Sequence, residues 1–138
     1  MPFYVTEQMK SIIEDVMPNV TMKAAAGEFM KAAILTKEES KGGSLHSHAD
    51  EEQWSYIIKG KMHFVLGDEE RILEEGDFVH IPRNVNHRSR AIDGLVVYFT
   101  VKSPVNAGGM RDDMKRIGGK ESEEAEKKFD AAVKNNRL

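Results

Sequence analysis

The chain has 138 residues, the size of one domain with a single hydrophobic core, so we expect no second folded unit. Its formal net charge is −3, which gives no general attraction to phosphate backbones and argues against a nucleic-acid partner. It contains no cysteine, which excludes disulfide frameworks, thiolate nucleophiles and cysteine-based metal sites, so any metal must use His, carboxylate or amide ligands.

The first predicted element is a helix within residues 1–20. Apolar residues recur there with the spacing of one helical face, at Met9, Ile12, Ile13, Val16 and Met17. Thr6 is a suitable N-cap, and Pro18 would end the helix. We therefore expect residues 1–20 to be a helical segment that precedes the main fold.

Residues 21–104 alternate between short apolar runs and turn signals. The runs that predict strands are Thr21–Ala24, Glu28–Leu35, Trp54–Ile58, Lys61–Leu66, Arg71–Leu73, Phe78–Ile81, His87–Ile92 and Leu95–Val101. Glycine, asparagine or aspartate, which tolerate positive φ, separate nearly all of them, as at Gly60 and at Asp93 and Gly94. Evenly spaced strands without intervening helices predict an all-β antiparallel barrel or sandwich.

Residues 105–138 are expected to form a linker followed by a helix. From Glu121 to Asn136, charged residues surround a thin apolar stripe made of Ala125, Phe129, Ala132 and Val133. We expect this helix to lie on the barrel or on a second subunit. The alternative is a mostly solvated tail, because so narrow a stripe buries little apolar area.

Two histidines after Gly43 have the spacing of metal ligands. Residues two apart on a strand point to the same face, so His46 and His48 can present two imidazoles to one point. Further along, His87 opens another predicted strand. His63 and His80 also lie on predicted strands, and we interpret both as structural or surface histidines.

These segments resemble the paired motifs of the cupin superfamily. The first motif consists of a glycine, the His-x-His pair, an acidic or amide residue and Gly60, and the second contains Gly76, Pro82 and His87. The resemblance covers residues 44–87 and implies an antiparallel double-stranded β-helix, that is, a jelly-roll barrel. It also implies that one divalent metal ion binds inside the barrel to four side chains, His46, His48, Gln53 and His87.

The fourth ligand position leaves an alternative open. In the family it lies seven residues before the closing glycine, here Gly60, and is usually glutamate, whereas this chain has Gln53 there. Glu52 is the rival: strand parity places the two residues on opposite faces without telling which face is inside, and a bulge before Trp54 would exchange them. We favour Gln53, since the chain resembles family members whose Glu-Gln pair binds metal through the amide.

The resemblance implies a metal-dependent function. An ion held by three imidazoles and a neutral amide should be a strong Lewis acid, and nitrogen ligands favour Fe, Ni, Zn, Mn or Cu over Ca and Mg. We expect a metal-dependent isomerase, lyase or cyclase that acts on a small oxygen-rich substrate, a keto or hydroxy acid or a sugar-like molecule. The alternatives are an Fe-dependent dioxygenase and a non-enzymatic cupin that binds a small molecule.

The remaining expectations concern the cavity wall, partners and location. Tyr98, Thr100 and Lys102 share one strand face and can point into the barrel. We expect a homodimer, because a small barrel has open strand edges that the N-terminal segment and apolar residues of outer strands can cover. No run approaches the roughly 20 apolar residues of a membrane span and no signal region is visible, so we expect a cytoplasmic protein without a membrane partner.

Overall fold

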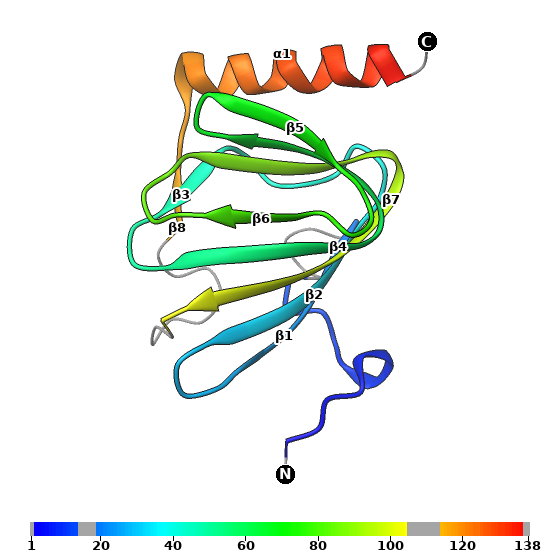
Figure 1. Cartoon of the computed structure of the whole chain (residues 1–138), viewed down its shortest axis with the longest axis vertical. Helices are drawn as coiled ribbons and strands as arrows, with labels where there is room; N and C mark the ends of the chain where they lie inside the picture. The colour runs from blue at the N-terminus through cyan, green and yellow to red at the C-terminus, as the bar shows by residue number, and fades with distance from the viewer. Residues whose placement is uncertain (1, 14–18, 105–113, 137–138) are drawn as a thin grey trace.

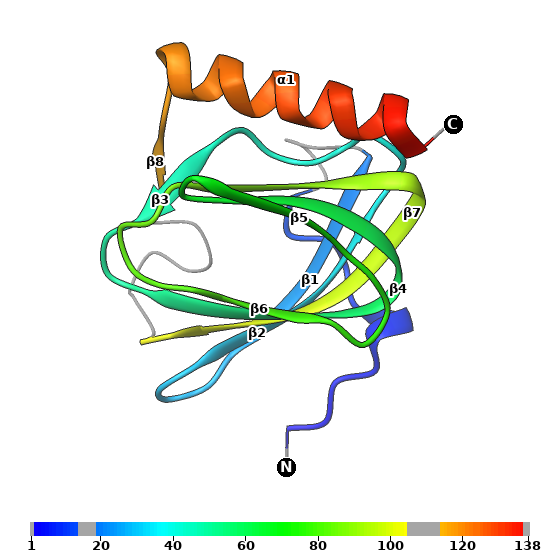
Figure 2. The same cartoon turned by 45° about the horizontal axis from the view of Figure 1, so that its top comes forward.

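The computed structural model describes residues 2–13, 19–104 and 114–136. Within them, antiparallel strands curl into one barrel-shaped sheet, and helix α1 (Gly119–Asn136) lies across one end of it (Figures 1 and 2). The strands are β1 (Val20–Ala26), β2 (Lys31–Lys37), β3 (His46–His48), β4 (Glu52–Leu66), β5 (Glu69–Leu73), β6 (Phe78–Ile81), β7 (His87–Ser103) and β8 (Met114–Arg116). The predicted all-β antiparallel barrel is confirmed.

Two long strands, β4 and β7, join the rest of the sheet. Strand β7 pairs with β2, β3 and β4, and β4 pairs along its other edge with β6 and then β5. Each long strand contains two of the predicted runs, so the expected turns at Gly60 and Asp93 are bends within strands. The β4–β7 register shifts between Ile57 and Lys61, where Gly60 on β4 and Asp93 and Gly94 on β7 have positive φ. The bulges bend the strands and thereby help to close the barrel.

The N-terminal segment differs from the helix that its periodicity predicts. In the described residues it forms one 3-10 turn, η1 (Thr6–Gln8). Farther along, the Ile12 N–H donates to the Met22 carbonyl at 2.8 Å, and the Met22 N–H donates to Ser11 Oγ at 3.0 Å. Because these bonds run across to β1, the backbone is engaged there instead of in the i to i−4 ladder of a helix. The last expected helical residues, 14–18, lie outside the described residues.

The C-terminal helix is confirmed, and it packs on the barrel of its own chain. Its apolar stripe points inward, with Ala125 and Phe129 buried. The Arg88 guanidinium, on β7, donates to the Ala125 carbonyl at 2.7 Å, and Arg90 makes two bonds of 2.6 and 2.8 Å to the Glu126 carboxylate. Burial of the Phe129 ring alone contributes roughly 1.5–3 kcal/mol. The stripe is therefore sufficient when arginines from β7 anchor the helix.

The core fills the centre of the barrel. A cluster of buried residues forms it: Ala33, Leu35, Ile57, Met62, Phe64, Leu73, Ile81, Ala91, Val96 and Tyr98. These residues come from β2, β4, β5, β6 and β7, so side chains from opposite walls of the barrel meet inside it. The only helix in the described residues with the length of a membrane span, α1, is too polar to cross a bilayer.

Candidate metal centre

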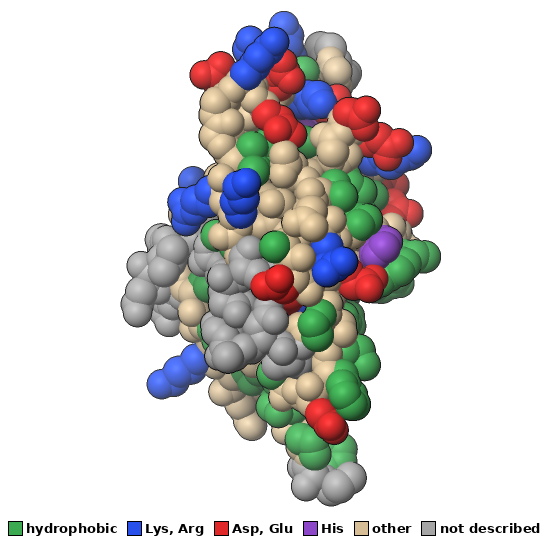
Figure 3. All heavy atoms as spheres, turned by 90° about the vertical axis from the view of Figure 1, so that its left-hand side faces the viewer, with side chains coloured by type: hydrophobic (Ala, Val, Ile, Leu, Met, Phe, Trp, Pro, Cys, Tyr) green, Lys and Arg blue, Asp and Glu red, His purple; other side chains and the backbone are tan. Residues whose placement is uncertain are grey.

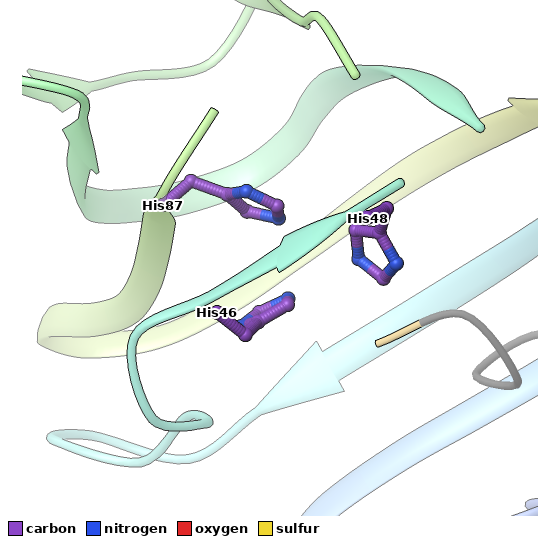
Figure 4. Close-up of side chains that lie close together, drawn as sticks. All are labelled: His46, His48 and His87. Carbon is purple, nitrogen blue, oxygen red and sulfur yellow. The ribbon is translucent and has the colours of Figure 1, made fainter. Parts of the chain in front are cut away.

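Three histidines converge at one end of the barrel interior. His46 and His48 lie on β3, and His87 begins β7 directly opposite His46 in the sheet register. One ring nitrogen from each lies within 4.8 Å of the other two. The ring centroids of His46 and His87 are 4.2 Å apart, and Figure 4 shows the three rings gathered around a common space. The predicted convergence of these residues is present.

Backbone carbonyls orient two of the imidazoles. His46 Nδ1 lies 2.7 Å from the Ser44 carbonyl oxygen, and His87 Nδ1 lies 2.9 Å from that of Val85. A carbonyl can only accept, so each Nδ1 carries the proton and each Nε2 keeps its lone pair. Metal-binding histidines in proteins are commonly held in this way, with the second ring nitrogen bonded to a carbonyl or carboxylate.

The environment keeps His46 and His87 neutral. Burial is the largest cause of a lowered pKa for both, and it brings the pKa of His46 to about 4 and that of His87 to about 3. The neighbouring histidines and Lys102 lower both values further, whereas the bonds to the carbonyls oppose the shift. Both rings are therefore unprotonated at neutral pH, the form in which imidazole binds a metal. The donor set fits a divalent transition ion.

The structure places Gln53 and Glu52 on opposite sides of the sheet. Gln53 lines the same cavity as the three histidines. Glu52 is exposed on the outside, where its carboxylate lies 2.9 Å from Nε2 of His80. Of the two candidates for the fourth position, Gln53 is therefore the one whose side chain shares the cavity with the histidines.

Two hydroxyl groups bond to the nitrogen of the Gln53 side-chain amide. Its Nε2 donates to Thr100 Oγ1 at 2.7 Å and to Ser55 Oγ at 3.2 Å. The Thr100 hydroxyl can in turn donate to the Trp54 carbonyl at 3.1 Å, and its oxygen also lies 2.9 Å from Ser55 Oγ. With the amide nitrogen facing these two hydroxyls, the Gln53 carbonyl oxygen is the amide atom available to a metal.

The histidines open into a cavity of about 460 Å³, a size typical of small-molecule sites. Leu35, Phe64 and Ile81 supply apolar wall. The strand face predicted to point inward does so: Tyr98, Thr100 and Lys102, on β7, all line the cavity. In the described part of the chain, no aspartate or glutamate lines it.

The sequence reasoning missed Lys37, which also lines this cavity. Ala33 and Leu35, two and four residues earlier, are buried on the inner face of β2. Strand parity would therefore have placed Lys37 inside, but a lysine at the end of a strand is normally taken as solvent-exposed.

The other two predicted-strand histidines lie outside the cavity. His63 is buried beneath α1, with Nε2 2.8 Å from a Glu70 carboxylate oxygen and its ring edge-on to Phe129. Burial lowers its pKa, and the bond to Glu70 opposes the shift. His80 is exposed and stacks on Trp54 with ring centroids 4.4 Å apart. Both positions agree with the interpretation of these residues as structural or surface histidines.

Known proteins resemble this chain in both sequence pattern and fold. The family model described as Cupin domain matches residues 34–101. KdgF from Halomonas sp. has a TM-score of 0.71 and 22% identity, over 80% of this chain and 99% of that chain. An RmlC-like cupin from Shewanella frigidimarina has a TM-score of 0.70 and 20% identity, over 80% of this chain and 96% of that chain.

A third solved structure is Pac13, a nucleoside dehydratase from Streptomyces. Its TM-score is 0.68 at 12% identity, over 85% of this chain and 91% of that chain. No curated protein matches the chain by sequence. At these identities the likeness concerns the fold, and it agrees with the jelly-roll barrel expected from the motifs.

Proposed function

We propose that this chain, whose residues 34–101 match the Cupin domain model, is a metal-dependent isomerase, lyase or cyclase acting on a small oxygen-rich acid. The observation that carries this proposal is the convergence of three imidazoles, of which those of His46 and His87 are held neutral by burial, in a small-molecule-sized cavity. Gln53 is the proposed fourth ligand, held by Thr100 and Ser55.

Each part of the cavity has a role in this proposal. A divalent transition metal bound by His46, His48, Gln53 and His87 would supply Lewis-acid chemistry, undiminished by any charged ligand. The apolar wall excludes water, which strengthens electrostatic interactions with the substrate. Tyr98 and Lys102 line the same cavity, so a hydroxyl and an ammonium belong to the wall that faces the substrate.

One structural neighbour supports the lyase branch in particular. Pac13 is named a nucleoside dehydratase, and a dehydratase removes water from its substrate. At 12% identity the likeness itself concerns the fold, and the lyase branch is proposed because a barrel of this fold bears the name of a dehydratase. The acid character of the substrate is supported by the cavity, where lysines and no described carboxylate line the wall.

The test is metal analysis of protein purified without added metal, followed by a screen of keto and hydroxy acids with an oxygen electrode. Zinc, nickel or manganese, with substrate consumed and no oxygen uptake, is the expected result. Iron with substrate-dependent oxygen uptake would instead establish the dioxygenase alternative. Binding of an acid without its conversion would establish the non-enzymatic alternative. The His46→Ala protein is the control, since it lacks one proposed ligand.

We also propose that two copies of the chain pair through an outer aromatic patch, defined as Trp54, Tyr56, Phe78 and Phe99. Tyr56 on β4 lies between Phe78 on β6 and Phe99 on β7 in the sheet register. The exposed fractions of Tyr56 and Phe78 are 47% and 66%. Figure 3 shows hydrophobic side chains gathered along the right-hand edge of that view. Contiguous exposed apolar surface of this kind is typical of protein interfaces.

A further inference from the structure

Lys37 is a buried cation in the wall of the cavity. It ends β2, whose alternate residues Lys31, Ala33, Leu35 and Lys37 are all buried. Only 5% of Lys37 is exposed, and it lines the same cavity as the three histidines. A lysine so deeply placed is unusual unless a partner balances its charge.

The Lys37 ammonium has neutral partners in the described part of the chain. It donates to the Ser89 carbonyl at 3.1 Å and to Ser89 Oγ at 2.7 Å, and it lies 5.2 Å from the centre of the Tyr98 ring. An ammonium has three protons, so the two bonds to Ser89 leave one for another acceptor. Ser89 thus holds the charge in place without neutralising it.

Lys31 on the same strand shows the contrast. Its ammonium is equally buried, and it pairs with the Glu51 carboxylate at 2.9 Å. A buried ion of this kind is normally accompanied by an opposite charge, because desolvation costs several kcal/mol per ion. At Lys31 the chain itself supplies the carboxylate. At Lys37 the cavity is the side from which a carboxylate can come.

The surroundings of Lys37 favour an anion. Lys102 and Arg116 line the cavity as well, and no described lining residue is acidic. The charges of Lys37 and Lys102 both lower the pKa of His46, so both lysines act electrostatically on the candidate metal centre. A divalent ion there would add to the same positive field, and a ligand with one negative group would not balance it.

We propose that Lys37, held by Ser89, is an anion-binding site for a second carboxylate of the substrate, whose other end lies at the histidine cluster. The free ammonium proton donates to a carboxylate oxygen, which forms a buried ion pair. The substrate class is therefore a small dicarboxylate, such as a keto or hydroxy diacid. This inference rests on the proposed function, because it uses the metal centre as the anchor for the first oxygen group.

The test is calorimetric titration of zinc-loaded protein with malonate, succinate and glutarate, and with the monocarboxylate butyrate. The three dicarboxylates differ in the distance between their carboxylates, so the series covers different separations between Lys37 and the histidine cluster. We expect at least one dicarboxylate to bind roughly tenfold or more tightly than butyrate, as a buried charge-assisted pair provides. Lys37→Met should remove that preference and keep the zinc stoichiometry. Lys59→Met, at an exposed position on β4, should keep both.

A merely structural role for Lys37 predicts different results. If Lys37 is an anion site, its removal takes away an uncompensated buried charge, so the melting temperature of ligand-free Lys37→Met should be unchanged or higher. Lys37→Gln, which keeps a polar group near Ser89, provides a second variant in which the dicarboxylate preference should also be lost. A lower melting temperature with an unchanged preference in both variants would establish the structural role and overturn the proposal.

The outcomes also separate this inference from the proposed function. Full zinc content with equal dicarboxylate binding by wild type and Lys37→Met would overturn the anion site and leave the metal-dependent function standing. Failure of the wild-type protein to bind zinc or any other divalent transition metal would overturn the proposed function and, with it, this inference.

Discussion

At the scale of single residues, the four proposed ligands should contribute unequally to metal binding. Neutral imidazole is a better donor to late transition metals than an amide oxygen. His46→Ala, His48→Ala or His87→Ala should therefore abolish stoichiometric metal, and Gln53→Ala should weaken binding and shift the spectrum of a cobalt-substituted site.

Glu52→Ala is the matched control for Gln53→Ala, since Glu52 is adjacent in sequence and lies on the outer face of β4. It should leave both metal content and the cobalt spectrum unchanged. Full metal retention by His87→Ala, together with metal loss in Glu52→Ala, would contradict the ligand assignment.

The buried histidines also predict how stability depends on pH. Burial lowers the pKa of His46 to about 4 and that of His87 to about 3, whereas an unfolded chain has the ordinary value of 6.5. Between these values the unfolded chain binds more protons, so the free energy of unfolding of metal-free protein should fall as pH decreases below about 6.5. Thermal melts between pH 7 and pH 4 would measure this fall.

A His46→Gln, His87→Gln double variant should show a shallower fall over the same range, because its site no longer takes up protons on unfolding. An identical slope in both proteins would contradict the assignment of the pH dependence to these residues. With metal present, protons compete less effectively for imidazoles of lowered pKa, so metal should stay bound below pH 6, where ordinary imidazoles are protonated.

The sequence was informative about the histidines and ambiguous about their neighbours. The spacing of His46 and His48 is a local pattern that predicts two ligands on one face, and the resemblance to the two cupin motifs implied that His87 joins them. The choice between Gln53 and Glu52 depends on which face of β4 is inside, which local parity does not contain. Lys37 was missed for a related reason: its burial depends on the closure of the barrel around β2.

At the scale of elements, Gly60 should be the residue on which the bend of β4 depends. It has a φ of 83°, and a Cβ atom there would lie 2.1 Å from the Leu95 carbonyl oxygen on β7. Gly76 has a similar φ of 90° with nothing within 4 Å of the same position, which makes it a matched control.

Gly76→Ala should cost about 1–2 kcal/mol for the left-handed backbone alone. Gly60→Ala should cost that amount and about 1–3 kcal/mol more, because the backbones of β4 and β7 must separate. Urea denaturation gives both values. Equal losses in the two variants would mean that the close approach of the strands at Gly60 does not stabilise the bend.

The elements themselves were predicted best where the pattern agrees with tertiary pairing. The apolar stripe of α1 was sufficient to predict that helix. The N-terminal stripe around Ile12 was not sufficient to predict a helix, because hydrogen bonds between this segment and Met22 on β1 override the helical periodicity. Turn signals at Gly60 and Asp93 correctly marked positive φ, but a glycine or aspartate signal does not distinguish a turn from a bulge. Strand β8, within the predicted linker, has no such pattern.

At the scale of the whole molecule, the outer aromatic patch should control association. Tyr56→Lys places a charge at the centre of the patch and should convert the expected dimer to a monomer in light scattering at micromolar concentration. Phe29→Lys is the control, since Phe29 is also exposed, at 68%, but lies outside the patch. A wild-type protein that is already monomeric would contradict the proposed dimer.

The central claim is that one divalent ion is bound inside the barrel by His46, His48, Gln53 and His87. The most direct measurement is a crystal structure of protein purified without added metal, with anomalous data at the absorption edge of the metal found by elemental analysis. We expect one anomalous peak per chain, about 2.0–2.2 Å from Nε2 of His46 and His87, a ring nitrogen of His48 and Oε1 of Gln53. A metal-containing protein whose peak lies elsewhere, or is bound by Glu52, would contradict this account.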